Sequence, residues 1–235
     1  MDDLATKAVD AWVKTLEEER QPDGKWHPSS ISSPCMRAAL LQKQGVEPSN
    51  PPNDQTKRVF RIGHIFHEFV QEAISNQPAI TLALSEVKVA HPLLEVEGAA
   101  DMLVAYGMTN ELIEIKSIKD SGLNYGIPKP EHLMQAGIYT FCLRENGGTT
   151  EDGIRILPIG DRLTRMRFVY VGKETMTIRE KVVEYTEELE DRILKRIGQL
   201  REYEKMGELP LAIAKDSWYT RYCQYKGSGN CCGDK

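Results

Sequence analysis

The sequence predicts an α/β domain in which strands form the centre and helices surround them. Three observations carry this expectation. Apolar residues recur at spacings of three and four in the first third of the chain, which is typical of helices. Apolar and polar residues alternate through the middle, which is typical of strands. A helix, two strands and a long helix follow without a repeat or a clear linker, so we expect one domain over residues 1–235.

The helices are expected from amphipathic spacing and from helix-breaking residues at their ends. Leu4, Val9 and Trp12 recur near helical spacing in the first segment, and Gly147 and Gly207 follow later periodic segments. Helices are therefore expected over residues 1–20, 35–43, 57–75, 130–145 and 174–206, with loops over 21–34 and 45–56.

The strands are expected from β-rich composition and from alternation. The clearest case is the run LIEIKS at residues 112–117, in which apolar and polar side chains alternate. The final segment, 211–235, is rich in Gly, Tyr and Cys. Strands are expected over residues 80–90, 94–105, 112–117, 154–159 and 166–171.

The composition bounds the class of protein. With 30 Lys and Arg against 35 Asp and Glu, the net charge is −5, which excludes a histone-like basic arm but allows local basic patches. No apolar run approaches the roughly 20 residues that a membrane helix needs. The acidic start at Asp2 and Asp3 lacks the features of a secretory signal. We therefore expect a cytoplasmic protein with no membrane partner, in which disulfides are rare, so the five cysteines need another explanation.

Charged side chains on two neighbouring predicted strands form the main candidate site. Asp101 lies on one strand, and Glu114 and Lys116 lie two residues apart on the next, so these two share a face. Two carboxylates can hold a hard divalent cation, and a lysine beside them can orient water or neutralise a phosphate. The set suits metal-assisted phosphodiester hydrolysis, although an edge strand with a solvated polar face fits the same pattern.

Two predicted helices carry polar residues on single faces beside these strands. Gly63, His67 and Gln71 are spaced four apart, so a small residue would let this face approach the sheet and His67 could add a nitrogen ligand. Gln135 and Tyr139 are also four apart and could hydrogen-bond a nucleic-acid backbone. A structural histidine and ordinary helix–sheet packing are the alternatives.

In chain order, the motifs GxxxHxxxQ, GxxD, ExK and QxxxY resemble those of the RecB-type branch of the PD-(D/E)XK nuclease superfamily. The chain is similar to CRISPR-associated RecB-like iron–sulfur exonucleases from Cys35 to its C-terminus. The resemblance implies a nuclease core at about residues 57–172, with a central mixed β-sheet flanked by helices, and flanking segments 1–56 and 173–235. Ala100 stands where the family name has proline, a departure that does not touch the chemistry.

The resemblance also implies roles for individual residues. The implied ligands of a Mg²⁺ or Mn²⁺ ion are His67, Asp101, Glu114 and the backbone carbonyl of Ile115. Lys116 would position the attacking water and stabilise the transition state. Gln135 and Tyr139 would contact the substrate or steady the lysine.

The cysteines fall into two groups. Cys142 lies between Phe141 and Leu143 and is interpreted as a core residue. The resemblance implies that the other four hold an iron–sulfur cluster of the 4Fe–4S type, which would join the N- and C-terminal segments. These four are Cys35, Cys223, Cys231 and Cys232. Thr220 stands where the usual pattern, closer to C-x₂-C-x₅-C, has a cysteine, so zinc and metal-free exposed thiols remain open alternatives.

Basic and aromatic residues indicate two places where DNA would lie. Five basic residues between Arg155 and Lys173 accompany one acidic residue, although a solvated strand face is the favoured interpretation there. In the tail, aromatic and basic residues interleave, which suits single strands, and aromatic packing is an equal alternative. These tail residues are Trp218, Tyr219, Arg221, Tyr222, Tyr225 and Lys226.

Together these patterns predict a metal-dependent DNA nuclease, specifically an exonuclease acting on single-stranded or unwound ends. The chain has no G-x-x-x-x-G-K-[ST] loop, so unwinding would come from a helicase, recombination or integrase partner. The alternative is a DNA-end-binding scaffold or assembly module for such a partner. The expected settings are phage or mobile-element recombination, repair and CRISPR adaptation, with the host cytoplasm as the location of a phage protein and an oligomer possible.

Overall fold

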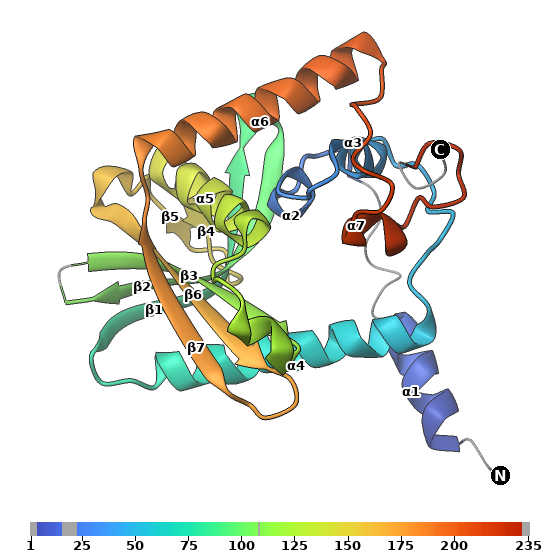
Figure 1. Ribbon diagram of the computed structural model, residues 1–235. Helices are drawn as coiled ribbons and strands as arrows, with labels where there is room; N and C mark the ends of the chain where they lie inside the picture. The colour runs from blue at the N-terminus through green and yellow to red at the C-terminus, as the bar shows by residue number, and fades with distance from the viewer. Residues whose placement is uncertain (1–3, 16–22, 108, 232–235) are drawn as a thin grey trace.

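A computed structural model of the protein describes residues 4–15, 23–107 and 109–231, and Figure 1 shows how its elements are arranged. The helices are α1 (Leu4–Thr15), α2 (Pro28–Ile31), α3 (Met36–Lys43), α4 (Asp54–Ser75), α5 (Pro130–Glu145), α6 (Glu187–Met206) and α7 (Trp218–Arg221). The strands are β1 (Ile80–His91), β2 (Val96–Tyr106), β3 (Thr109–Ile118), β4 (Gly148–Thr149), β5 (Arg155–Ile156), β6 (Leu163–Gly172) and β7 (Ile178–Glu184). Short 3₁₀ turns are η1 (Pro92–Leu94), η2 (Asp120–Asn124) and η3 (Gly160–Arg162).

The strands form one seven-stranded sheet in the order β5-β4-β1-β2-β3-β6-β7. The pair β3–β6 is parallel, and the other neighbouring pairs are antiparallel. A parallel pair needs a long crossover, and here the crossover from β3 to β6 contains α5. The predicted α/β class with a mixed sheet flanked by helices is therefore confirmed.

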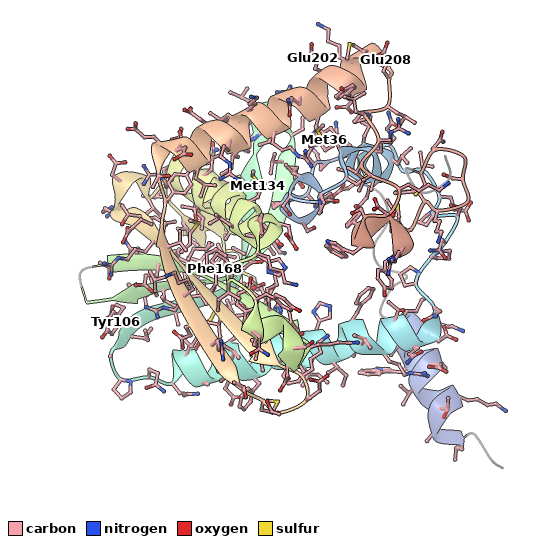
Figure 2. The ribbon with its side chains drawn as sticks, in the orientation of Figure 1. Met36, Tyr106, Met134, Phe168, Glu202 and Glu208 are labelled. Atoms are coloured by element: carbon pink, nitrogen blue, oxygen red, sulfur yellow. The ribbon has the colours of Figure 1, made fainter. Side chains whose placement is uncertain are left out.

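Helices cover both faces of the sheet because its central strands are apolar on both sides. On the face covered by α5 and α6, the core includes Leu112, Phe168 and Ile193, and Met134 of α5 packs against it (Figure 2). On the opposite face, α4 packs against a second cluster that contains Ile113 and Ile115 among others (Figure 1). Alternate residues of β3 thus enter two different cores.

The long helix predicted over residues 174–206 is wrong in its first part. The chain instead turns back after β6 and forms β7, an edge strand antiparallel to β6. Its charged residues make the segment read as helical, but they belong to a half-exposed strand. The side chain of Thr186 then accepts the N–H of Leu189 at 3.3 Å and caps α6, which ends at Gly207 in the left-handed conformation (φ 69°).

Other differences are smaller. The strand expected at 154–159 is reduced to β5, which pairs with β4. The segments expected to be loop and tail contain the one-turn helices α2 and α7. The first predicted helix is observed as α1, and its expected continuation to residue 20 lies outside the described residues. Within the described parts of the chain, no helix combines the length and the apolar character that spanning a membrane would need.

Candidate active site

The centre of the site is the point where β2 and β3 separate. Their antiparallel pairing runs from Tyr106 opposite Thr109 to Met102 opposite Ile113. Directly beyond this pairing, Oδ2 of Asp101 accepts the backbone N–H of Ile115 at 2.6 Å. A side chain thus takes the hydrogen bond that a neighbouring strand would otherwise take.

Glu114 has the most unusual environment in this group. Its side chain is 1% exposed, and its Oε2 has no hydrogen-bond partner. The ammonium of Lys116 lies 2.5 Å from Oε1, as an ion pair. Burial raises the pKa of Glu114 to about 7, because the attraction of Lys116 offsets burial only in part and the charge of Asp101 adds to it. Lys116 therefore does not supply enough positive charge to hold the pKa of Glu114 at its ordinary value.

Lys116 remains an ammonium in this setting. Burial alone would lower the pKa of Lys116, but the charges of Glu114 and Asp101 raise it above its ordinary value. Burial would likewise raise the pKa of Asp101, but the hydrogen bond from His67 and the charge of Lys116 hold it below its usual range. One cation is thus shared by two carboxylates.

The polar face of α4 reaches the same place. Nδ1 of His67 lies 3.4 Å from Oδ1 of Asp101, and this contact raises the pKa of His67 although burial alone would lower it. The amide of Gln71 donates to the backbone carbonyl of Asp101 at 2.9 Å. Gly63 faces Ser117, but an added methyl there would be 3.4 Å from its Oγ, which is an ordinary contact. Close approach at this point therefore does not require glycine.

Glu86 joins the site although the sequence analysis did not identify it. It lies on β1, where the paired residues on either side are opposite Met102 and Ala100, so Glu86 stands beside Asp101. Its φ of 48° is in the left-handed region, which is costly for a residue other than glycine. The amide of Gln71 donates to its Oε1 at 2.8 Å, and burial together with the charge of Asp101 raises the pKa of Glu86.

The face of α5 that carries Gln135 and Tyr139 also borders the site. Nε2 of Gln135 donates to the hydroxyl of Tyr139 at 3.3 Å. Burial and the charge of Glu114 raise the pKa of Tyr139, so its hydroxyl keeps its proton. A Cβ on Gly98 would come within 3.1 Å of the Tyr139 ring and 2.9 Å of Pro28. The glycine of the GxxD motif is therefore needed for packing beside the site.

A second pair beside Lys116 was also missed. Tyr170 on β6 is opposite Lys116 in the parallel ladder, and its hydroxyl lies 2.6 Å from Nδ1 of His132. The same hydroxyl accepts the backbone N–H of Lys129 at 3.1 Å. Burial and the charges of two lysines lower the pKa of His132 to about 3. The ring is therefore neutral at neutral pH.

The donor set can be tested for its fit to a divalent metal. Among the residues that the structure describes, no three His, Cys, Asp or Glu side chains form a preassembled metal-binding group. The chemistry of the donors nevertheless fits, because Asp101 contacts His67, the charges of both act on Glu114, and the three supply oxygen and nitrogen atoms. Oε2 of Glu114 has no partner and the pKa of this carboxyl group is about 7, so a cation here would satisfy the oxygen and favour the ionised form.

Three of the four cysteines predicted to act together share one buried cluster. It contains Cys35, Cys223 and Cys231 with Tyr225, and the thiols of Cys223 and Cys231 are in hydrogen-bonding contact. Cys232 lies outside the described residues. The N- and C-terminal segments therefore meet at cysteines, while the cluster itself stays a prediction.

Two other residues from the cysteine argument have structural places. Cys142 lies in the main core and is 0% exposed, as predicted. The hydroxyl of Thr220 donates to the carbonyls of Lys215 at 2.6 Å and Ser217 at 2.7 Å. Thr220 thus stabilises the turn that begins α7.

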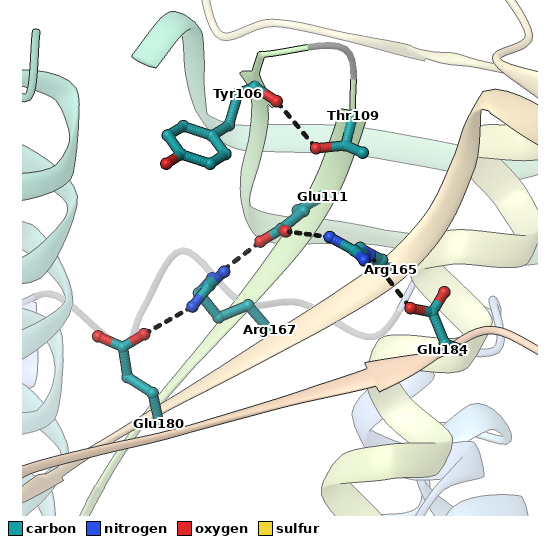
Figure 3. A network of polar contacts seen from close by, with 7 residues as sticks. All are labelled: Tyr106, Thr109, Glu111, Arg165, Arg167, Glu180 and Glu184. Carbon is teal, nitrogen blue, oxygen red and sulfur yellow. Dashed lines mark hydrogen bonds and ion pairs between the residues drawn. The ribbon is translucent and has the colours of Figure 1, made fainter. Parts of the chain in front are cut away.

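Two of the five basic residues between Arg155 and Lys173, namely Arg165 and Arg167, form ion pairs within the sheet. Figure 3 shows Nε of Arg167 at 2.8 Å from Glu111, its Nη1 at 2.8 Å from Glu180, and Arg165 at 3.1 Å from Glu184. These ion pairs fit the interpretation as a strand face better than a DNA-binding patch.

Comparisons with known proteins show the fold. No family model matches the chain, and no curated protein matches it. A crystal structure of SSO0001 covers 94% of this chain and 94% of its own, with a TM-score of 0.56 and 16% identity. An alkaline exonuclease (LHK-Exo) from Laribacter hongkongensis covers 79% of this chain and 90% of its own, with a TM-score of 0.54 and 16% identity. LHK-Exo in complex with dAMP gives a TM-score of 0.53 at 18% identity, covering 78% of this chain and 89% of its own. The chain has the fold of these proteins, and its activity must be argued from the site.

Proposed function

We propose that the protein is a divalent-metal-dependent DNA nuclease that hydrolyses phosphodiester bonds, acting as an exonuclease on single-stranded or unwound ends. The observation that carries this proposal is the buried carboxylate of Glu114, which lies beside Asp101, pairs with Lys116 through Oε1 and has no partner for Oε2. The fold shared with an alkaline exonuclease supports the same class of activity.

In this proposal the metal is Mg²⁺ or Mn²⁺. Its ligands would be His67, Asp101, Glu114 and the backbone carbonyl of Ile115. When bound, it would supply Lewis-acid stabilisation of the phosphate and a water of lowered pKa. Gln71 keeps this group in place, because its amide spans Glu86 and the carbonyl of Asp101.

The remaining side chains act on the water and the phosphate. Lys116 holds the attacking water through its ammonium and neutralises charge that develops on the phosphate. Tyr139 and Gln135 are hydrogen-bond donors at neutral pH and contact the substrate or steady the lysine. His132 adds a neutral imidazole ring near Lys116.

DNA is the proposed substrate because the site supplies cation and hydrogen-bond donors suited to phosphates, and LHK-Exo was crystallised with dAMP. A helicase, recombination enzyme or integrase would supply unwound ends. Recombination of phage or mobile elements, repair and CRISPR adaptation are the settings that we propose.

The test is cleavage of end-labelled linear single-stranded DNA, linear duplex and circular single strands, each with Mg²⁺, Mn²⁺ or EDTA. Lys116→Ala should abolish metal-dependent loss of linear strands, and Lys119→Ala, an exposed lysine three residues later, should not. Sparing of circles would support an exonuclease. Binding of DNA ends without cleavage in either metal would overturn the nuclease proposal in favour of the scaffold.

We also propose that Cys35, Cys223, Cys231 and Cys232 hold an iron–sulfur cluster of the 4Fe–4S type. The burial of the first three in one cluster supports this. Burial raises the pKa of Cys223 to about 12, so binding would release its proton. Protein purified without oxygen should contain iron, sulfide and visible absorbance, which Cys223→Ser removes and Cys142→Ser keeps. Zinc or no metal in such a sample would refute the cluster.

A further inference from the structure

Two aromatic side chains of the tail are exposed although their neighbours are anchored. Trp218 is 59% exposed and Tyr222 is 80% exposed. By contrast, Tyr225 is 1% exposed and belongs to the cysteine cluster. The three tyrosines and one tryptophan of the tail thus divide into packing residues and residues that face solvent.

The exposed pair is held on a fixed support. The side chain of Ser217 accepts the N–H of Tyr219 and caps α7, of which Trp218 is the first residue and which Tyr222 directly follows. The hydroxyl of Ser33 donates to that of Tyr219 at 2.7 Å, and the Tyr219 ring meets Trp218 edge-on at 5.6 Å. Holding the aromatic rings in place lowers the entropy that they lose on binding a ligand.

This support is continuous with the rim of the candidate active site. Ser33 lies just after α2, and Pro28 at the start of α2 packs beside Gly98 and the ring of Tyr139. Figure 1 shows α2 between α5, which carries Tyr139, and α7. The helix that carries Trp218 therefore lies on the same side of α5 as α2 does.

The charges around the pair favour a polyanion. Between residues 215 and 226 the exposed charged side chains are Lys215, Asp216, Arg221 and Lys226, three basic against one acidic. Flat aromatic rings interleaved with basic side chains are typical of surfaces that bind single-stranded nucleic acid, because bases stack on the rings and phosphates meet the cations.

We propose that Trp218 and Tyr222 form a base-stacking platform that binds the single-stranded part of the nucleic acid acted on at the candidate active site. Arg221, between them in the chain, would contact the backbone. The reason for a strand to lie there rests on the proposed nuclease function, but the binding itself can be measured without cleavage.

The experiment measures binding of a fluorescent oligothymidine by anisotropy, using full-length Lys116→Ala protein in EDTA. In that background Trp218→Ala and Tyr222→Ala should each weaken binding about 5- to 150-fold, the value of one lost base stack. Trp218→Phe and Tyr222→Phe should retain most of the affinity. Tyr106→Ala is the matched control, because this tyrosine is 50% exposed at the far end of β2 (Figure 2).

An abasic strand of the same length separates stacking from charge. It should bind more weakly than oligothymidine and equally to the parent, Trp218→Ala and Tyr222→Ala proteins, whereas Arg221→Ala should weaken both strands. Unchanged oligothymidine affinity in both alanine variants would overturn the platform. The same result is expected if these two residues bind a protein and not nucleic acid. Cleavage by wild-type protein with normal binding by the variants would refute the platform and leave the nuclease standing. If the alanine variants lose binding but the wild-type protein cleaves no DNA, the result would support the platform and overturn the nuclease proposal.

Discussion

Glu114→Gln should stabilise the metal-free protein above neutral pH, because burial disfavours the ionised carboxylate and Lys116 compensates only in part. Burial raises the pKa of Glu114 from 4.5 to about 7. At about 1.4 kcal/mol for each tenfold change in the protonation equilibrium, the ionised carboxylate costs about 3 kcal/mol of folding free energy. Glutamine keeps the shape of the side chain and removes the charge.

The sign of the pH dependence follows from where the proton binds more tightly. Between the unfolded pKa of 4.5 and the folded pKa of about 7, the native state of the wild type retains a proton that the unfolded chain loses. The stability that this proton contributes is fully present below the unfolded pKa and is lost as the pH rises through the folded pKa. The wild type should therefore lose about 3 kcal/mol relative to Glu114→Gln across this range.

Urea unfolding in EDTA at a series of pH values measures this difference. Glu47→Gln, in an exposed loop, is the control and should follow the wild type. Adding Mg²⁺ or Mn²⁺ at alkaline pH should stabilise the wild type and have little effect on Glu114→Gln, because only the carboxylate gains a ligand. A difference that stays constant with pH, or equal stabilisation of both proteins by the metal, would refute the reasoning.

Two further predictions concern the surroundings of the site. Gly98→Ala would place a methyl 2.9 Å from Pro28 and 3.1 Å from Tyr139, so it should cost about 1–3 kcal/mol in urea unfolding and lower cleavage. Gly198→Ala, in open space on α6, should instead add about 1 kcal/mol, and equal losses for both would contradict the packing argument. Because burial lowers the pKa of His132 to about 3, this ring should not titrate near neutral pH, which an NMR titration of the imidazole resonances checks.

Periodicity alone located most of the candidate site. A spacing of two on a strand places Glu114 and Lys116 on one face, and a spacing of four on a helix does the same for His67 and Gln71. These are local relations, so they can be read from the sequence. The structure adds that Asp101 contacts both elements: it accepts the N–H of Ile115 on β3 and lies beside His67 on α4.

The missed residues depend on pairings that local sequence does not contain. Tyr170 is beside Lys116 only because β6 pairs in parallel with β3, and His132 is placed by its bond to Tyr170. Glu86 lies at the site where the backbone of β1 adopts a left-handed conformation. The sequence does not predict this conformation, because a glutamate within a strand segment is not a residue that favours it. The error at β7 has a related cause, since an edge strand exposes charged residues much as a helix does.

The charges at the site explain why nucleic acid and metal should act together. Glu86, Asp101 and Glu114 are acidic. The pKa values of Glu86 and Glu114 are raised because both side chains are buried and both are repelled by the charge of Asp101. Lys116 is held by two of them and cannot also attract a phosphate strongly. A strand would therefore approach an electronegative site on a chain with a net charge of −5. Asp101 and Glu114 would hold a divalent cation, which would reverse this local balance and leave Lys116 able to meet the phosphate, so productive DNA binding at the site should require the metal.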